Sequence, residues 1–203
     1  MTTISLLGCG YLGFPLSIEL IKKGYYVKGS TTTPTKLQQL KKAGVIPYLI
    51  HIENIIPSDF FEADILVLTL PYKKSFTDPT IYRNQLNIVC DNVKKSSIQH
   101  IVFTSSSTVY PKDSKIYSPS DNFKPVNLRA KVLLECEEII NKLDNISVVT
   151  IRLGGIYGAG RLLKESTKHR RLVSHHDALK YIENGINMVG NNDCINGFTN
   201  IVI

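Results

Sequence analysis

The residues with the clearest chemistry lie near the N-terminus, where three glycines follow a short apolar run. The run Ile4–Leu7 ends in the pattern Gly-x-Gly-x-x-Gly, formed by Gly8, Gly10 and Gly13. In such a pattern the first glycine allows a tight turn, the second lets the backbone approach a pyrophosphate, and the third lets the next helix pack against the strand. The amides and the dipole at a helix N-terminus also favour anions. Because the pattern lies between a predicted strand and a predicted helix, it predicts a dinucleotide site.

The segment after the second predicted strand bears on which dinucleotide is bound. Sites for NAD place a carboxylate here for the ribose 2′-hydroxyl, and that charge would repel the 2′-phosphate of NADP. This chain instead has the hydroxyls of Ser30, Thr31 and Thr32, followed by Lys36. We predict NADP or NAD as cofactor, with the loop favouring NADP, although the arginine typical of NADP sites is missing. Thr33 is interpreted more simply as a helix cap than as a cofactor ligand.

Further residues of the predicted cofactor site follow the carboxyl ends of the strands, where ligands bind in open α/β sheets. The residues that we predict to bind the cofactor are Gly8, Gly10, Tyr11, Leu12, Gly13, Ser30, Thr31, Thr32, Thr69 and Pro71.

Alternating strand-like and helix-like segments must position these residues. That alternation predicts an α/β fold, a doubly wound parallel sheet of Rossmann type with helices on both faces. We expect the strand order 3-2-1-4-5-6, with a seventh strand at the C-terminus. Strands are predicted over 3–8, 25–30, 46–52, 65–70, 101–104, 146–153 and 198–203, and helices over 11–23, 34–43, 79–95, 126–142 and 177–186.

Composition narrows the class of protein. The 203 residues, 43% hydrophobic and 20% charged, suffice for a real core. No apolar run approaches the roughly 18 residues of a membrane helix, and no signal segment precedes the first strand, so we expect a cytoplasmic protein. Scattered cysteines without metal-binding spacing predict reduced thiols and no metal site. They are Cys9, Cys90, Cys136 and Cys194.

The formal net charge of +7 is spread over short clusters of lysine and arginine, without a nucleic-acid-binding motif. A basic surface that suits an anionic small-molecule substrate is therefore the better interpretation. We expect a dinucleotide and a small substrate as partners, and neither nucleic acid nor a membrane. A homodimer is compatible with the sequence.

Three motifs, taken in order, resemble the extended or atypical short-chain dehydrogenase/reductase superfamily, in its NAD-dependent epimerase/dehydratase group. They are the glycine motif, Phe103–Tyr110 with its Ser-Ser-x-x-Val-Tyr, and Arg152–Gly158. The resemblance covers residues 3–185 and implies an NAD(P)-dependent oxidoreductase or epimerase. Its substrate would be nucleotide-sugar-like or another small hydroxyl or carbonyl compound. The resemblance further implies a Rossmann domain over 1–160 and a partial, shortened C-terminal substrate-binding portion over 161–203.

The same resemblance implies two catalytic residues. Ser106, beside Ser105, matches the residue that hydrogen-bonds the reacting oxygen, while a serine-rich turn that satisfies its own backbone is the alternative. Lys131 matches the lysine that binds the nicotinamide ribose, with an ordinary surface lysine as the alternative. Asn127 stands where the family has its acid/base tyrosine, and an amide exchanges no proton near neutral pH. A dinucleotide-binding sensor or interaction protein without turnover is therefore the alternative function.

Tyrosines and histidines complete the candidates. Tyr110 and Tyr117 lie in the preceding segment and are alternative phenols for the site. The segment His175–Asp177 resembles the family's substrate-pocket segment, or else forms a solvated helix N-terminus. His51 and His100 adjoin predicted strands and are interpreted as structural.

Overall fold

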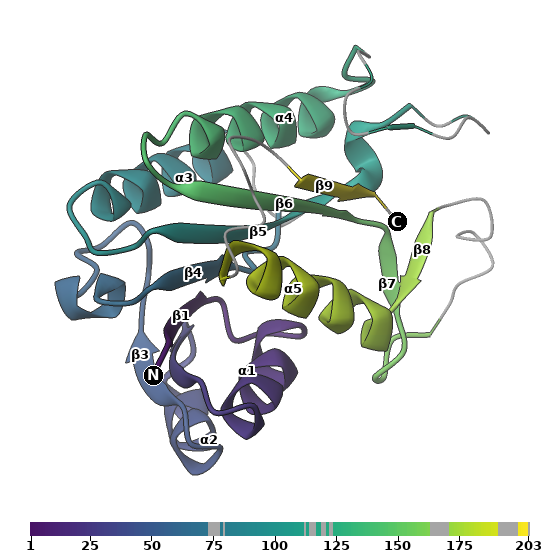
Figure 1. Ribbon diagram of the computed structural model, residues 1–203. Helices are drawn as coiled ribbons and strands as arrows, with labels where there is room; N and C mark the ends of the chain where they lie inside the picture. Colours follow the sequence, from purple (N-terminus) through teal and green to yellow (C-terminus); the bar gives the residue numbers. More distant parts are fainter. Residues whose placement is uncertain are drawn as a thin grey trace.

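The computed structural model describes residues 1–72, 78, 80–111, 113, 117–118, 121, 124–162 and 171–190, and the backbone of 199–202. Within this part of the chain strands and helices alternate around a central parallel sheet (Figure 1).

The elements have the following bounds. The strands are β1 (Thr3–Leu7), β2 (Tyr26–Thr31), β3 (Ile46–Leu49), β4 (Ile65–Leu68), β5 (His100–Ser106), β6 (Ser147–Leu153), β7 (Gly155–Tyr157), β8 (Leu172–Ser174) and β9 (Thr199–Val202). The helices are α1 (Gly13–Lys22), α2 (Leu37–Lys42), α3 (Thr80–Val93), α4 (Leu128–Asn141) and α5 (His175–Gly190), and the short 3-10 turns are η1 (Pro34–Lys36), η2 (Ser58–Phe61) and η3 (Ser107–Val109).

The main sheet has the order β3-β2-β1-β4-β5-β6-β9, and its paired strands run parallel. This confirms the predicted Rossmann-type fold class and strand order, with β9 as the seventh strand. β4 is the central strand, and all four of its residues are buried, as a strand covered on both faces requires. The strand order reverses beside β1, and ligands of such sheets bind at that point.

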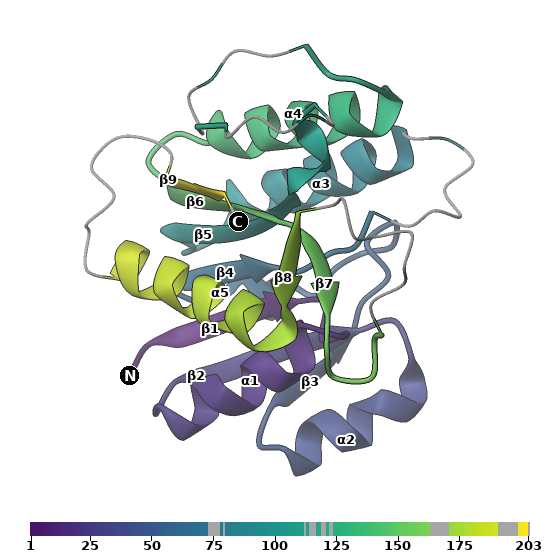
Figure 2. The ribbon, with the colours of Figure 1, turned by 90° about the vertical axis from the view of Figure 1, so that its right-hand side faces the viewer.

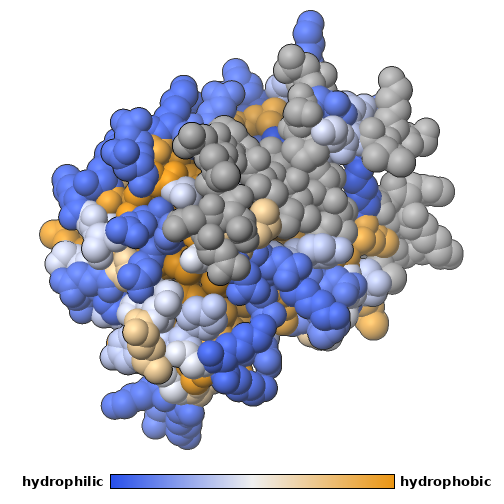
Figure 3. Space-filling view, in the orientation of Figure 1, coloured by the Kyte–Doolittle hydropathy of each residue, from blue (hydrophilic) through white to orange (hydrophobic). Residues whose placement is uncertain are grey.

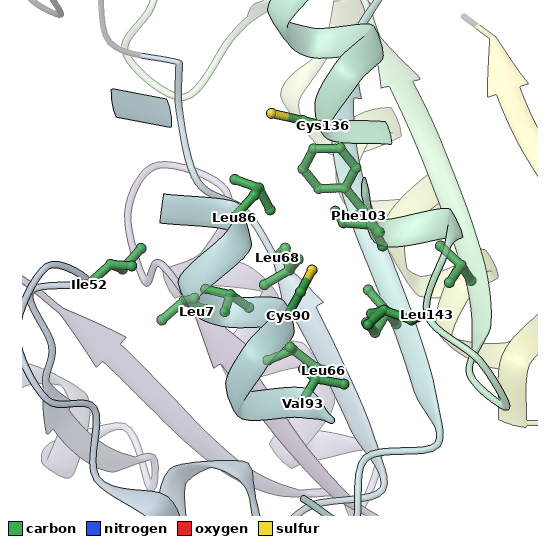
Figure 4. Packing of buried hydrophobic residues seen from close by; sticks show 14 of the residues in the cluster. Leu7, Ile52, Leu66, Leu68, Leu86, Cys90, Val93, Phe103, Cys136 and Leu143 are labelled. Atoms are coloured by element: carbon green, nitrogen blue, oxygen red, sulfur yellow. The ribbon is translucent and has the colours of Figure 1, made fainter. Parts of the chain in front are cut away.

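Helices cover both faces of the sheet and create two cores (Figure 2). One core packs α3 and α4 on the sheet; Figure 4 shows Leu86 and Cys90 of α3 beside Phe103 of β5 and Cys136 of α4. The other core packs α1, α2 and α5 on the opposite face. Here α5 approaches the sheet closely, because a Cβ added at Gly185 would lie 3.2 Å from a methyl of β6. Both helical layers leave the carboxyl ends of the strands accessible.

Several elements differ from the prediction. The strands β7 and β8 form a separate two-stranded parallel sheet that the sequence analysis did not predict, because three residues are too short for a periodic pattern. Helix α5 begins at His175 rather than 177 and extends to Gly190. The predicted division at residue 160 stays a prediction, and α5 packs directly on β5 and β6. Cys194 lies outside the described residues.

In the coloured part of the face seen in Figure 3, most side chains are hydrophilic, with smaller hydrophobic areas between them. This agrees with amphipathic helices that bury their apolar side against the sheet. Of the helices in the described ranges, none combines the length and the hydropathy that crossing a membrane would require.

Candidate functional site

A cavity of about 1450 Å³ lies at the carboxyl ends of the central strands. It is larger than the roughly 300–1,000 Å³ typical of small-ligand sites, so it has room for a cofactor and a substrate. Most residues that the sequence predicted to bind the cofactor line it. These are Gly8, Gly10, Tyr11, Leu12, Ser30, Thr31, Thr32, Thr69 and Pro71.

The glycine loop has the geometry that its sequence pattern predicts. Gly8 has a φ of +111°, a conformation that side chains disfavour. A Cβ at Gly13 would lie 2.6 Å from a methyl of Leu6 and 2.9 Å from the Thr69 hydroxyl, so α1 could not pack as closely. A Cβ at Gly10 would meet nothing within 4 Å. The loop therefore forms an open cradle at the N-terminus of α1, and it fits a pyrophosphate.

Two of the predicted cofactor residues hold this loop in place. Ser30 accepts a hydrogen bond from the Gly8 amide through its Oγ (2.9 Å) and from the Cys9 amide through its carbonyl (2.7 Å). Thr69 donates its hydroxyl to the Gly8 carbonyl (2.7 Å). Burial raises the pKa of the Cys9 thiol to about 12, so the thiol is protonated at neutral pH. In the structure Ser30 and Thr69 thus position the loop.

The segment after β2 reaches the cavity with Thr32 and Lys36, as predicted. The Thr31 hydroxyl accepts from the Thr33 amide (3.1 Å) and so stabilises the turn before η1. A carboxylate also lines the cavity. It belongs to Glu53, which follows β3, so a search restricted to the end of β2 missed it.

Ser106 lies at the end of β5 and lines the cavity. Its Oγ accepts hydrogen bonds from the Thr108 amide (3.3 Å) and the Thr108 hydroxyl (2.9 Å). With Thr108 as the donor in both bonds, the Ser106 hydroxyl proton has no acceptor among the described residues. Ser105 instead donates to Glu137 beneath the cavity (2.5 Å).

A buried ion pair lies under this part of the site. Glu137 of α4 and Arg152 of β6 are 4% and 5% exposed, and Arg152 Nη2 is 2.6 Å from Glu137 Oε2. Arg152 also donates to the Tyr110 phenol (2.6 Å). Burial lowers the pKa of Arg152, but its hydrogen bonds and charge interaction with Glu137 raise it more. The network fixes both ends of the segment that carries Ser106.

Helix α4 presents a different side to the cavity than expected. Arg129 and Leu133 line the cavity, together with Asn127 at the rim. Lys131 is not among the described lining residues; its side chain is 62% exposed and its ammonium lies 3.9 Å from Glu135. The physical reason is that α4 buries Ala130, Leu133 and Glu137, which turns Lys131 outward. The predicted role of Lys131 as ribose ligand and catalytic residue gains no support from this geometry.

Asn127 caps α4, since its Oδ1 accepts from the Ala130 amide at 2.9 Å. Asn127→Ala is therefore expected to lower the free energy of unfolding by about 1 kcal/mol, whereas Asn127→Asp should leave it unchanged within about 0.5 kcal/mol. Urea unfolding of the three proteins measures this. Equal stabilities for the alanine and aspartate variants would contradict the capping role.

The other candidates lie in varied places. The Tyr117 hydroxyl donates to Asp113 (2.6 Å), and its ring stacks on that of Tyr110. His51 lines the cavity, whereas His100 begins β5 at the amino-terminal end of the strands, opposite the cavity. The segment His175–Asp177 opens α5, and His175 contacts the glycine loop through Tyr11. That contact was not predicted.

Positive charge predominates among the described residues that line the cavity. The Arg129 guanidinium lies 5.1 Å above the Tyr72 ring, and its Nε is buried without a hydrogen-bond partner among the described residues. A guanidinium that lines a cavity suits an anionic ligand. The charged lining residues are Lys36, Arg129, Arg161 and Arg171, against Glu53 and Asp113.

The sheet order, the glycine loop and the cavity at the strand ends define a dinucleotide-binding domain of the Rossmann class. The family described as the NAD binding domain of 6-phosphogluconate dehydrogenase matches residues 3–119. The chain belongs to this family, and it therefore binds a nicotinamide dinucleotide, which is either NAD or NADP.

Two curated relatives show sequence similarity. Protein YeeZ of Escherichia coli is 31% identical over 167 residues, which cover 79% of this chain. The match spans 61% of that relative, so this chain corresponds to about three fifths of its length. A probable 3-hydroxyisobutyrate dehydrogenase of Mycobacterium bovis is 30% identical over 82 residues, covering 38% of this chain and 26% of the relative.

Solved structures show the same fold at low sequence identity. A UDP-glucose-4-epimerase from Stenotrophomonas maltophila with bound NAD has a TM-score of 0.81 at 13% identity, covering 100% of this chain and 78% of that one. The predicted resemblance to the epimerase/dehydratase group is thus matched at the level of fold. The family match differs from it, because it is to the 6-phosphogluconate dehydrogenase type of NAD-binding domain.

Proposed function

We propose that this chain is an NAD(P)-dependent oxidoreductase or epimerase that acts on a small hydroxyl or carbonyl substrate bearing negative charge. The observation that carries the proposal is the shared cavity, which joins the glycine cradle to the Ser106 hydroxyl and to Arg129. When bound, the nicotinamide supplies or accepts a hydride. The protein's part is to orient and polarise the substrate.

Ser106 supports this chemistry because it lines the cavity and its hydroxyl can donate to the reacting oxygen of the substrate. Arg129 supports an anionic substrate, since this cationic side chain lines the cavity. The arginine side chain suits carboxylate and phosphate groups, because its fork of N–H donors matches their oxygens.

The test has two steps. Fluorescence titration with NADPH and NADH should show saturable binding of at least one cofactor. Oxidation or reduction of the bound nicotinamide, followed by absorbance, should then occur with anionic hydroxyl or carbonyl compounds, such as sugar nucleotides and hydroxy acids, and not with neutral sugars. The variant Ser106→Ala should lose this turnover and keep the cofactor affinity of the parent.

One observation favours a second candidate function, a dinucleotide-binding protein without turnover. Asn127, where the resemblance expects an acid/base tyrosine, is engaged in capping α4, and Lys131 points away from the cavity. Tight binding of NADPH or NADH without any hydride transfer across the substrate panel would favour this function over the enzyme.

We further propose that the cofactor is NADP rather than NAD. Thr32 and Lys36, in the segment after β2, line the cavity. A 2′-phosphate bound beside this segment would need neighbouring side chains that are positive or neutral. Thr32→Asp is expected to shift preference toward NADH by at least about tenfold, or about 1.4 kcal/mol, because the new carboxylate repels the 2′-phosphate. Competition titrations of NADPH against NADH measure the shift.

Thr35→Asp is the matched control for this prediction. It adds the same charge to the same segment, but Thr35 is exposed and is not among the described lining residues. It should leave the preference unchanged. A parent protein that prefers NADH by about tenfold would overturn the assignment of NADP.

A further inference from the structure

Tyr11 of the glycine loop is held by residues far away in the sequence. Its hydroxyl donates to the Gly158 carbonyl, after β7. The Nε2 of His175, at the start of α5, lies 2.9 Å from the Tyr11 carbonyl. Because a carbonyl only accepts, this His175 nitrogen carries the proton. The loop after β7 is therefore anchored directly on the glycine loop.

Arg161 occupies one face of the same tyrosine. Its guanidinium carbon lies 3.6 Å from the centroid of the Tyr11 ring, and its side chain lines the cavity. Within the described chain no carboxylate pairs with Arg161. A guanidinium that stacks on an aromatic face keeps its in-plane N–H groups for other partners.

A tight turn fixes Arg161 in this position. Gly158 and Arg161 exchange two backbone hydrogen bonds of 2.9 Å each. The two residues between them have positive φ angles, 46° at Ala159 and 87° at Gly160. Alanine disfavours this left-handed conformation, and residues keep it where the surrounding contacts demand it. Here the contacts are those that tie the turn to Tyr11.

We propose that Arg161, stacked on Tyr11, binds the pyrophosphate of the dinucleotide and thereby completes the cofactor site from the C-terminal half of the chain. The proposal rests on the cofactor binding proposed above. Tyr11 follows Gly10, where the cradle is open, so the Arg161 guanidinium lies beside the position that we expect for the pyrophosphate. Planar guanidinium groups bind phosphate oxygens in pairs. Arg171, in contrast, stacks on Tyr110 and Tyr117 rather than on the glycine loop.

The test is binding of ADP-ribose, which contains the pyrophosphate and lacks the nicotinamide, so that the measurement is independent of turnover. In calorimetric titrations Arg161→Gln should weaken ADP-ribose and NADPH by about tenfold, as expected for loss of hydrogen bonds to a charged group. Arg161→Lys keeps the charge without the planar fork and should recover part of the affinity. Arg83 of α3, which pairs with Glu135 (3.1 Å), is not among the described lining residues, so Arg83→Gln is the matched control and should bind ADP-ribose like the parent.

The outcomes separate the two proposals. If the parent binds neither NADPH, NADH nor ADP-ribose, the proposed function fails and the role of Arg161 fails with it. If the parent binds ADP-ribose and Arg161→Gln binds it equally well, only the role of Arg161 is overturned. An equal loss in Arg83→Gln would also overturn it, since the effect would then reflect the net charge of the protein.

Discussion

Arg152→Ala is expected to lower the free energy of unfolding by about 3–5 kcal/mol, because it leaves a buried carboxylate without its counter-charge. The Glu137 carboxylate is 4% exposed, and three of its hydrogen bonds come from Arg152, at 2.6, 3.1 and 3.1 Å. The substitution also removes the donor to the Tyr110 phenol. Urea unfolding monitored by circular dichroism measures the loss.

The ion pair Lys94–Asp91 provides the matched control. Both side chains are more than 60% exposed, at 61% and 65%. Lys94→Gln should therefore change the stability by less than about 0.5 kcal/mol, as is usual for exposed pairs. A double variant in which methionine replaces both Glu137 and Arg152 should lose less than the two single variants together, because it leaves no unpaired charge. An Arg152→Ala protein within about 1 kcal/mol of the parent would contradict the argument.

Most of the fold follows from local sequence signals. The continuous apolar run over 65–70 predicted the buried central strand β4, and the glycine motif placed β1 and α1. The alternation of strands and helices predicted a parallel sheet, and the glycine motif between the first strand and helix indicated the Rossmann strand order. The pair β7 and β8 escaped prediction, since each has three residues and their pairing joins segments that are distant in the chain.

The candidate site could be predicted only where the backbone carries the function. The glycine loop and the segment after β2 were found because their residue types are demanded by local conformation and charge. The orientation of α4 could not be predicted in this way. The spacing of Asn127 and Lys131 shows that they lie on the same side of the helix, but it does not show which side faces the cavity. That choice is made by tertiary contacts, including the buried Glu137. An arginine within an otherwise apolar strand, Arg152, was the available signal for that buried charge.

Arg129 and Arg161 were missed for a related reason. Each is an ordinary basic residue in the sequence, and a dispersed net charge of +7 singles out neither. Their importance arises from what lies beside them in space, Tyr72 for the first and Tyr11 for the second. Aromatic side chains hold guanidinium groups in place without neutralising them, so the charge remains available to a ligand.

Gly10→Val is expected to abolish dinucleotide binding while the domain stays folded. A Cβ at Gly10 meets no atom within 4 Å, so the protein itself tolerates the side chain. The same space is where the pyrophosphate approaches the backbone, and the valine would occupy it. Affinity for NADPH and ADP-ribose should fall by at least about a hundredfold, or about 2.7 kcal/mol, in calorimetric titrations. The unfolding midpoint in urea should remain that of the parent.

Gly13→Ala distinguishes this steric effect from damage to the loop. Its Cβ would lie 2.6 Å from a Leu6 methyl and 2.9 Å from the Thr69 hydroxyl, so the loop or α1 must shift. Overpacking of this kind costs about 1–3 kcal/mol of stability, and binding should be lost together with it. Gly10→Val should therefore separate binding from stability, and Gly13→Ala should couple them. If Gly10→Val bound NADPH as tightly as the parent, the glycine motif would be a structural turn, and the pyrophosphate would have to bind elsewhere in the cavity.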